Sequence, residues 1–84
     1  MKEREEEVFK MTEKTQFIRE YLKSNVSAYF ENNPAHAMDD DADYNYVLGK
    51  VYMAAMAGII TRCERDDYVE RLETVHAERS CRFF

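Results

Sequence analysis

Polar and apolar residues along the first third of the chain follow the spacing of an amphipathic helix. Apolar or small residues recur every three or four positions, and lysine and glutamate fill the positions between them. This period predicts one helix over about residues 2–31, and Ser24 is its weakest position, where the helix can kink or break. Asn32, Asn33 and Pro34 end it, because Asn tolerates a left-handed cap and Pro cannot continue a helix. The apolar stripe consists of Val8, Met11, Thr15, Ile18, Leu22, Val26 and Tyr29.

The remaining apolar residues predict two shorter helices joined by a tight turn. A helix over about residues 41–57 is apolar almost all round, which is typical of a central helix or of one shared with a partner. Gly58 is suited to cap its C-terminus, and Thr61 with Glu64 three residues later forms a capping box. We therefore expect a third helix over about residues 62–78, antiparallel to the second.

These elements predict an all-α fold, a small three-helix bundle with a long N-terminal helix and a C-terminal antiparallel helical hairpin. With 84 residues the chain has room for one domain. Its two glycines and one proline are too few for the turns of a many-stranded sheet. Residues 32–40 are expected as an acidic loop. Residues 79–84 are expected as a tail, in which Cys81, Phe83 and Phe84 have no assigned role.

The first predicted helix is longer than the hairpin that should cover it. At about 1.5 Å per residue, an unbroken helix over residues 2–31 measures roughly 45 Å, against about 25–27 Å for the other two helices. Either this helix breaks, or its charged first turns project, or a second copy of the chain covers the exposed stripe. A homodimer through the first helix is therefore one functional hypothesis.

The negative charge of the chain is concentrated in one segment. The net charge is -5, and residues 31–43 contain five acidic side chains and no Lys or Arg. An acidic surface edged with aromatic residues repels phosphate and attracts basic protein surfaces. The alternative is that these carboxylates only cap a helix and solvate a loop. Tyr46 and Met53, seven residues apart, are expected to point away from the core. The predicted partner-binding residues are Glu31, Asp39, Asp40, Asp41, Asp43, Tyr44, Tyr46 and Met53.

Calcium binding has little support in this acidic segment. Asp39, Asp41 and Asp43 match the opening of an EF-hand loop, in which alternate carboxylates converge on the ion. The loop then fails, because Tyr44 stands where a glycine is needed for the sharp turn and Lys50 stands where a bidentate Glu should close the cage. We therefore expect no specific calcium site.

Zinc sites and catalytic centres also lack their usual motifs. The chain contains no phosphate-binding loop, no nucleophile elbow and no His-Glu-x-x-His element. Zinc-ligand residue types occur without the paired spacing of a zinc site. We therefore expect no metal, no cofactor and no enzymatic activity. The zinc-ligand types considered are His36, Cys63, His76 and Cys81.

Targeting and nucleic-acid signals are weak as well. The N-terminus is charged with no apolar stretch behind it, and no run of about 18 apolar residues follows, so neither a signal peptide nor a membrane contact is expected. Two cysteines are too few for a disulfide scaffold, which favours a cytoplasmic protein. The third predicted helix is net acidic, which disfavours direct nucleic-acid binding.

These features favour a non-catalytic binding module that docks an acidic, tyrosine-edged surface on a larger protein with a basic surface. A short acidic helical chain with a tight Gly58-Ile59-Ile60-Thr61 turn resembles small accessory proteins of phages and mobile elements, among them anti-CRISPR proteins. This resemblance of general style carries no residue roles. It implies an inhibitor that blocks a nucleic-acid-handling protein complex, with nucleic-acid mimicry as one version. The alternative function is a structural, self-assembling helical module.

Overall fold

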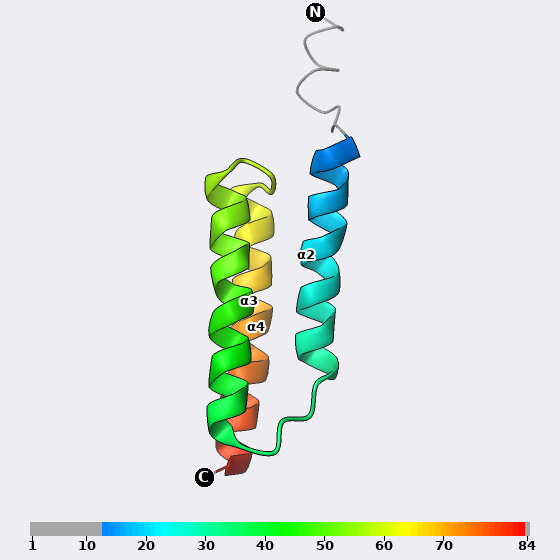
Figure 1. Cartoon of the computed structure of the whole chain (residues 1–84). Coiled ribbons are helices and arrows are strands. Elements are labelled where there is room, and N and C mark those ends of the chain that lie inside the picture. The colour runs from blue at the N-terminus through cyan, green and yellow to red at the C-terminus, as the bar shows by residue number, and fades with distance from the viewer. Residues whose placement is uncertain (1–12, 84) are drawn as a thin grey trace, which may run out of the picture.

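The computed structural model describes residues 13–83, and every regular element within them is a helix. Helix α2 spans Glu13–Glu31, α3 spans Ala37–Met56 and α4 spans Arg62–Phe83. The three helices lie side by side, and each runs in the direction opposite to the one before it (Figure 1). The predicted all-α three-helix bundle with a C-terminal helical hairpin is thereby confirmed.

Several predicted boundaries are wrong by a turn or so. Helix α3 begins at Ala37, so residues 37–40 are helical rather than part of an acidic loop. Its N-cap residue, His36, makes no side-chain capping hydrogen bond, and Asp39 and Asp40 lie in the first turn. Carboxylates there interact favourably with the positive end of the helix dipole, which explains why the helix starts before the acids rather than at them.

The predicted tail is also corrected. Helix α4 continues to Phe83, so residues 79–83 are helical, with Arg82 in the last turn where a cation is favoured. Helix α2 is continuous through Ser24.

The described part of α2 matches the hairpin in length. It has 19 residues, or about 28 Å, whereas α3 and α4 have 20 and 22 residues, or about 30 and 33 Å. The predicted stripe residues Val8 and Met11 lie outside the described residues. The length argument for a second copy therefore concerns residues 2–12 only.

The core is formed by the predicted apolar stripes of all three helices. Val51 and Leu72 have no exposed surface, and they place α3 and α4 in direct contact at the centre of the bundle. Tyr44, Leu48, Tyr68 and Val75 pack around this centre and are partly buried. Burial of apolar side chains is the main stabilising term for a bundle of this size. The buried apolar residues are Leu22, Val26, Tyr29, Val47, Val51, Ala54, Ile60 and Leu72.

The turn after α3 is formed by a Schellman motif, as the glycine predicted. Gly58 has a φ of 74°, a left-handed conformation that costs other residues energy. Its N–H donates to the carbonyl oxygen of Ala55 at 3.1 Å, and the N–H of Ile59 donates to that of Ala54 at 2.9 Å. Local hydrogen bonds therefore end α3 and begin the reversal of the chain.

The predicted capping box opens α4 and also ties α2 to the turn. The N–H of Thr61 donates to Oε1 of Glu64 at 2.9 Å, and the N–H of Glu64 donates to Oγ1 of Thr61 at 3.1 Å. Arg19 of α2 forms a bidentate ion pair with Glu64 and donates to the carbonyl oxygen of Ile59 at 2.8 Å. The Arg19 guanidinium, aided by Thr61, holds the pKa of Glu64 below its usual value.

Candidate partner-binding site

The eight predicted binding residues do not share one surface. Three of them, all on α3, face α4 or pack between the helices, and four line pockets between α2 and α3. Asp39 is exposed in the first turn of α3. The first group is Asp40, Asp41 and Tyr44, and the second group is Glu31, Asp43, Tyr46 and Met53.

Asp40 is an internal residue, so the prediction that it belongs to an exposed docking surface is wrong. It is 1% exposed. Its Oδ1 accepts from Nη1 of Arg79 at 2.9 Å, and its Oδ2 lies 2.8 Å from Nδ1 of His76. Burial alone would raise the pKa of Asp40, but the hydrogen bonds with Arg79 and His76 outweigh burial and hold it below its usual value.

Arg79 uses its remaining donor group to cap helix α2. Nη2 donates to the carbonyl oxygens of Tyr29 at 2.7 Å and Asn32 at 2.6 Å, and to that of Phe30 at 3.1 Å. Carbonyls at the end of a helix lack partners within the helix, so the guanidinium satisfies them. The Asp40–Arg79 pair therefore joins all three helices, a role that the sequence reasoning missed when it placed residue 79 in a tail.

Tyr44 is also largely part of the internal packing. Its ring stacks on that of His76, with 4.0 Å between the centroids and an interplanar angle of 4°. Burial raises the pKa of the Tyr44 phenol. Tyr44 is therefore a spacer between α3 and α4 more than an anchor for a partner.

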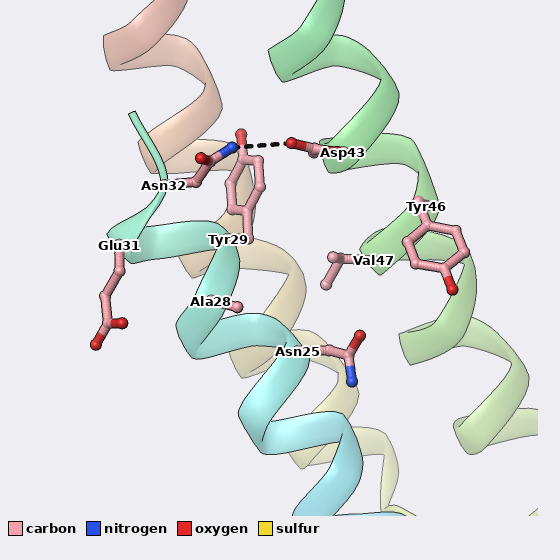
Figure 2. A pocket seen from close by; sticks show the side chains of 8 residues that line it. All are labelled: Asn25, Ala28, Tyr29, Glu31, Asn32, Asp43, Tyr46 and Val47. Carbon is pink, nitrogen blue, oxygen red and sulfur yellow. Dashed lines mark hydrogen bonds between the residues drawn. The ribbon is translucent and has the colours of Figure 1, made fainter. Parts of the chain in front are cut away.

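An acidic pocket lies between the C-terminal half of α2 and the N-terminal half of α3. It has a volume of about 430 Å³, and two of its lining residues, Glu31 and Asp43, are predicted binding residues from different helices. Figure 2 shows Asn32 reaching across the seam to Asp43, with 2.9 Å between Nδ2 and Oδ2. The lining residues are Asn25, Ala28, Tyr29, Glu31, Asn32, Asp43, Tyr46 and Val47.

An apolar pocket adjoins the acidic pocket further along the same seam. It has a volume of about 540 Å³ and contains the predicted residue Met53, which is 66% exposed. Tyr46, 62% exposed, lines both pockets. The two adjoining pockets are together called the α2–α3 groove, with an acidic end and an apolar end. The apolar pocket is lined by Ile18, Tyr21, Leu22, Tyr46, Gly49, Lys50, Met53, Ala54, Ala57 and Ile59.

Lys50 lies in the α2–α3 groove and is held by side chains from both walls. Its Nζ lies 4.3 Å from the ring centroid of Tyr46 and 4.6 Å from that of Tyr21, within the range of a cation–π contact. Nζ also donates to Oδ1 of Asn25 at 2.9 Å and to the Tyr21 hydroxyl at 3.1 Å. Tyr46 and Tyr21 hold the pKa of Lys50 above its usual value, so the groove contains a fixed positive charge.

Two aromatic residues of α2 that lie outside the apolar stripe are mostly exposed. Phe17 is 68% exposed and Tyr21 51%. Tyr21 lines the apolar pocket, and exposed apolar side chains of this size are typical of interaction surfaces. Phe17 and Tyr21 are four residues apart, so they lie on one face of α2. That this face is left uncovered depends on the angle at which α2 packs against the other helices.

Comparison of the chain with protein-family models, with curated proteins and with solved structures yields no match. None of the three described helices combines the length and the apolar character that a bilayer crossing requires. The α2–α3 groove and its surroundings are therefore the features of the molecule that bear on its function.

Proposed function

We propose that this chain is a non-catalytic binding module whose α2–α3 groove docks a segment of a larger protein that is basic at one end and apolar at the other. Tyr46 carries the proposal, because it lines the acidic pocket and the apolar pocket at once. A single ligand segment can therefore meet both environments. Tyrosine is also among the residues that contribute most to binding at interfaces.

Charge complementarity supports a basic partner for the acidic end. Glu31 and Asp43 are exposed and lie on the two walls of the acidic pocket. A Lys or Arg of the partner would meet the Asp43 carboxylate in the pocket, and the Glu31 carboxylate, which points away from Asp43 (Figure 2), adds negative charge nearby. Opposite charges also accelerate encounter. Lys50 would repel a second cation placed further along the groove. The two charges together favour one orientation of the partner segment over the reverse.

The apolar end supports insertion of a hydrophobic anchor. Met53 is flexible and polarisable, so it adapts to the shape of an incoming side chain. Gly49, in the pocket lining, has no atoms within 4 Å of the position that a Cβ would occupy. An anchor from the partner can therefore approach the α3 backbone closely.

The two carboxylates with lowered pKa values support binding over catalysis. Asp40 and Glu64 have lowered pKa values, and each is paired with an arginine that holds helices together. Perturbed pKa values also arise in structural ion-pair networks, and neither residue lines the α2–α3 groove. If the partner handles nucleic acid, occupation of its basic surface by this chain would block that surface.

The experiment is a site-specific cross-linking measurement on the full chain. A photo-reactive amino acid replaces Met53 in the groove or, as a matched control, Glu78 on α4, and the chain is irradiated in host lysate. The captured protein is then purified and its affinity measured at low and moderate salt. We expect capture from position 53 and not from position 78.

Charge variants distinguish the acidic pocket from general acidity. The double variant Glu31→Gln and Asp43→Asn should weaken binding of the captured protein at least tenfold and reduce its salt dependence. The control, Asp39→Asn and Glu78→Gln, removes the same charge outside the groove and should leave binding unchanged. Equal loss in both variants would reject the acidic pocket as the site. Cross-linking of the chain to itself at position 53 would reject a foreign partner in favour of the self-assembling module.

A further inference from the structure

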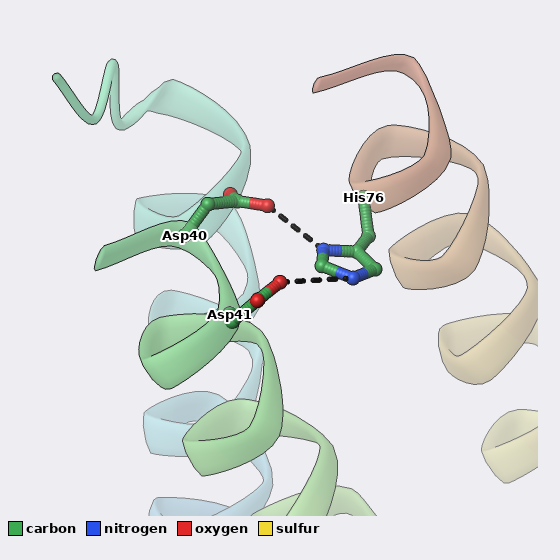
Figure 3. A group of neighbouring side chains, drawn as sticks. All are labelled: Asp40, Asp41 and His76. Atoms are coloured by element: carbon green, nitrogen blue, oxygen red, sulfur yellow. Dashed lines mark hydrogen bonds and ion pairs between the residues drawn. The ribbon is translucent and has the colours of Figure 1, made fainter. Parts of the chain in front are cut away.

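A second cluster of polar groups lies on the α3–α4 side of the bundle, away from the α2–α3 groove. Asp41 of α3 and His76 of α4 approach each other there, with 3.3 Å between Oδ1 and Nε2. The other ring nitrogen of His76, Nδ1, lies 2.8 Å from Oδ2 of Asp40 (Figure 3). The imidazole therefore stands between two carboxylates that come from adjacent positions on α3.

Charge balance differs between the two carboxylates. Asp40 is buried and is neutralised by Arg79, whose side chain is 4% exposed. Asp40 therefore accepts the N–H at Nδ1 of His76 without needing a further charge, and this hydrogen bond fixes which nitrogen carries the proton. Nε2 is then the ring nitrogen without a proton in the neutral imidazole, and Oδ1 of Asp41 lies 3.3 Å from it. A metal ion placed between Nε2 and Oδ1 would be bound by both atoms.

The separation of the two acceptors fits a metal ion. A charge-assisted N–H to O hydrogen bond is usually about 2.7–2.9 Å long, which is shorter than the 3.3 Å found here. Zinc bonds of about 2.0–2.1 Å in tetrahedral geometry place neighbouring nitrogen and oxygen ligands roughly 3.3 Å apart. A metal-binding histidine also commonly donates its other N–H to a carboxylate, which is the position of Asp40.

We propose that Nε2 of His76 and Oδ1 of Asp41 bind a divalent transition-metal ion of the zinc class, with Asp40 as the residue that positions the imidazole. Imidazole and carboxylate together suit zinc better than calcium or magnesium, which prefer oxygen ligands alone. The Asp41 side chain is 59% exposed, so water or a group from a bound partner completes the coordination. Tyr44 stacks on the ring and restricts its rotation.

The test is a calorimetric zinc titration of the full chain. Cys63 and Cys81 are exposed thiols that bind zinc themselves, so every protein in the series carries Cys63→Ser and Cys81→Ser. We expect one zinc ion per chain and at least a tenfold weaker affinity in Asp41→Asn. Asp39→Asn is the matched control, since it removes an exposed aspartate two positions away. His36→Gln is the control for the other histidine, and both controls should bind like the parent.

Nitrogen NMR of the His76 ring separates a bound metal from a bound proton. Zinc should shift the Nε2 resonance of His76 in the parent and not in Asp41→Asn, which leaves the Asp40–Arg79 pair intact and should therefore fold. Equal zinc affinity in Asp41→Asn and Asp39→Asn would overturn the site. A ring that keeps protons on both nitrogens in the presence of excess zinc would overturn it as well. Neither measurement tests binding in the α2–α3 groove. The metal-site proposal and the proposed function can therefore be rejected independently of each other.

Discussion

Helix α3 meets α4 through a seam that contains a buried ion pair and stacked rings, whereas its seam with α2 leaves a groove open to solvent. On the α4 side, Asp40 is buried against Arg79 and Tyr44 stacks on His76. On the α2 side, Tyr46 and Met53 are mostly exposed along two adjoining pockets. The first seam holds the fold together, and the second is available to a partner. Substitutions should therefore separate stability from binding according to the seam they touch.

The largest expected effect comes from removing Arg79. Arg79→Ala leaves Asp40 as an unpaired buried carboxylate and frees three carbonyls at the end of α2, and loss of one partner of a buried pair costs about 3–5 kcal/mol. Urea unfolding should show this loss. Arg71→Ala is the control on the same helix, because Arg71 pairs with Asp67 in an exposed position and should cost about 0–1 kcal/mol. Equal losses of stability in the two variants would mean that the buried Asp40–Arg79 pair is not the main polar interaction that holds the helices together.

A smaller effect, of opposite sign at two glycines, should appear within α3 and in the turn that follows it. Gly58→Ala places a Cβ at a positive φ and should destabilise the fold by about 1–2 kcal/mol. Gly49→Ala lies inside the helix with free space around it and should stabilise the fold by about 0.5–1 kcal/mol. Thermal unfolding measures both. A gain in stability at position 58 would contradict the Schellman turn.

The stability contributed by the Arg19–Glu64 ion pair, at the other end of α2, should depend on pH. Because the pKa of folded Glu64 is lowered below its ordinary value of 4.5, its stabilising contribution is complete above pH 4.5 and is lost as the pH falls through the folded value. The parent should therefore unfold at a higher temperature than Glu64→Gln at pH 7. The two melting temperatures should converge below pH 4.5. A constant difference from pH 7 to pH 3 would show that Glu64 acts through its shape and not its charge.

The smallest effect on stability is expected in the α2–α3 groove. Met53→Gln changes a side chain that is mostly exposed, so unfolding should change by no more than about 0.5 kcal/mol. The same variant should lose binding of the partner captured by cross-linking at that position. A large loss of stability would mean that Met53 belongs to the core. The α2–α3 seam would then also hold the fold together, and the distinction between the two seams would fail.

The parts of this fold that are encoded locally could be predicted from the sequence. Leu22, Val26 and Leu72 lie on stripes whose period the sequence shows directly, and all are buried. Gly58 and the Thr61 capping box depend on residues within one turn of each other, and both motifs are present. The exposure of Tyr46 and Met53 follows from their spacing of seven on a helix whose opposite face is buried.

The parts that depend on the relative placement of helices could not be predicted. Arg79 meets Asp40 and the end of α2 across 39 to 50 residues of chain, and no spacing rule reports such a contact. The same holds for Asp41 and His76. The acids between residues 39 and 43 look alike in sequence. Their environments differ because successive residues of a helix are about 100° apart around its axis. Asp40 therefore points inward and Asp43 points toward α2.

Among the described residues, Met38, Met53 and Met56 are all exposed, at 80%, 66% and 83%. Oxidation by peroxide would convert each thioether into a polar sulfoxide without disturbing the core. At Met53 this change would replace an apolar wall of the groove with a strong dipole. A preparation that ages in air would therefore keep its helical spectrum and its melting temperature while it loses the binding proposed for the α2–α3 groove, and methionine sulfoxide reductase would restore that binding.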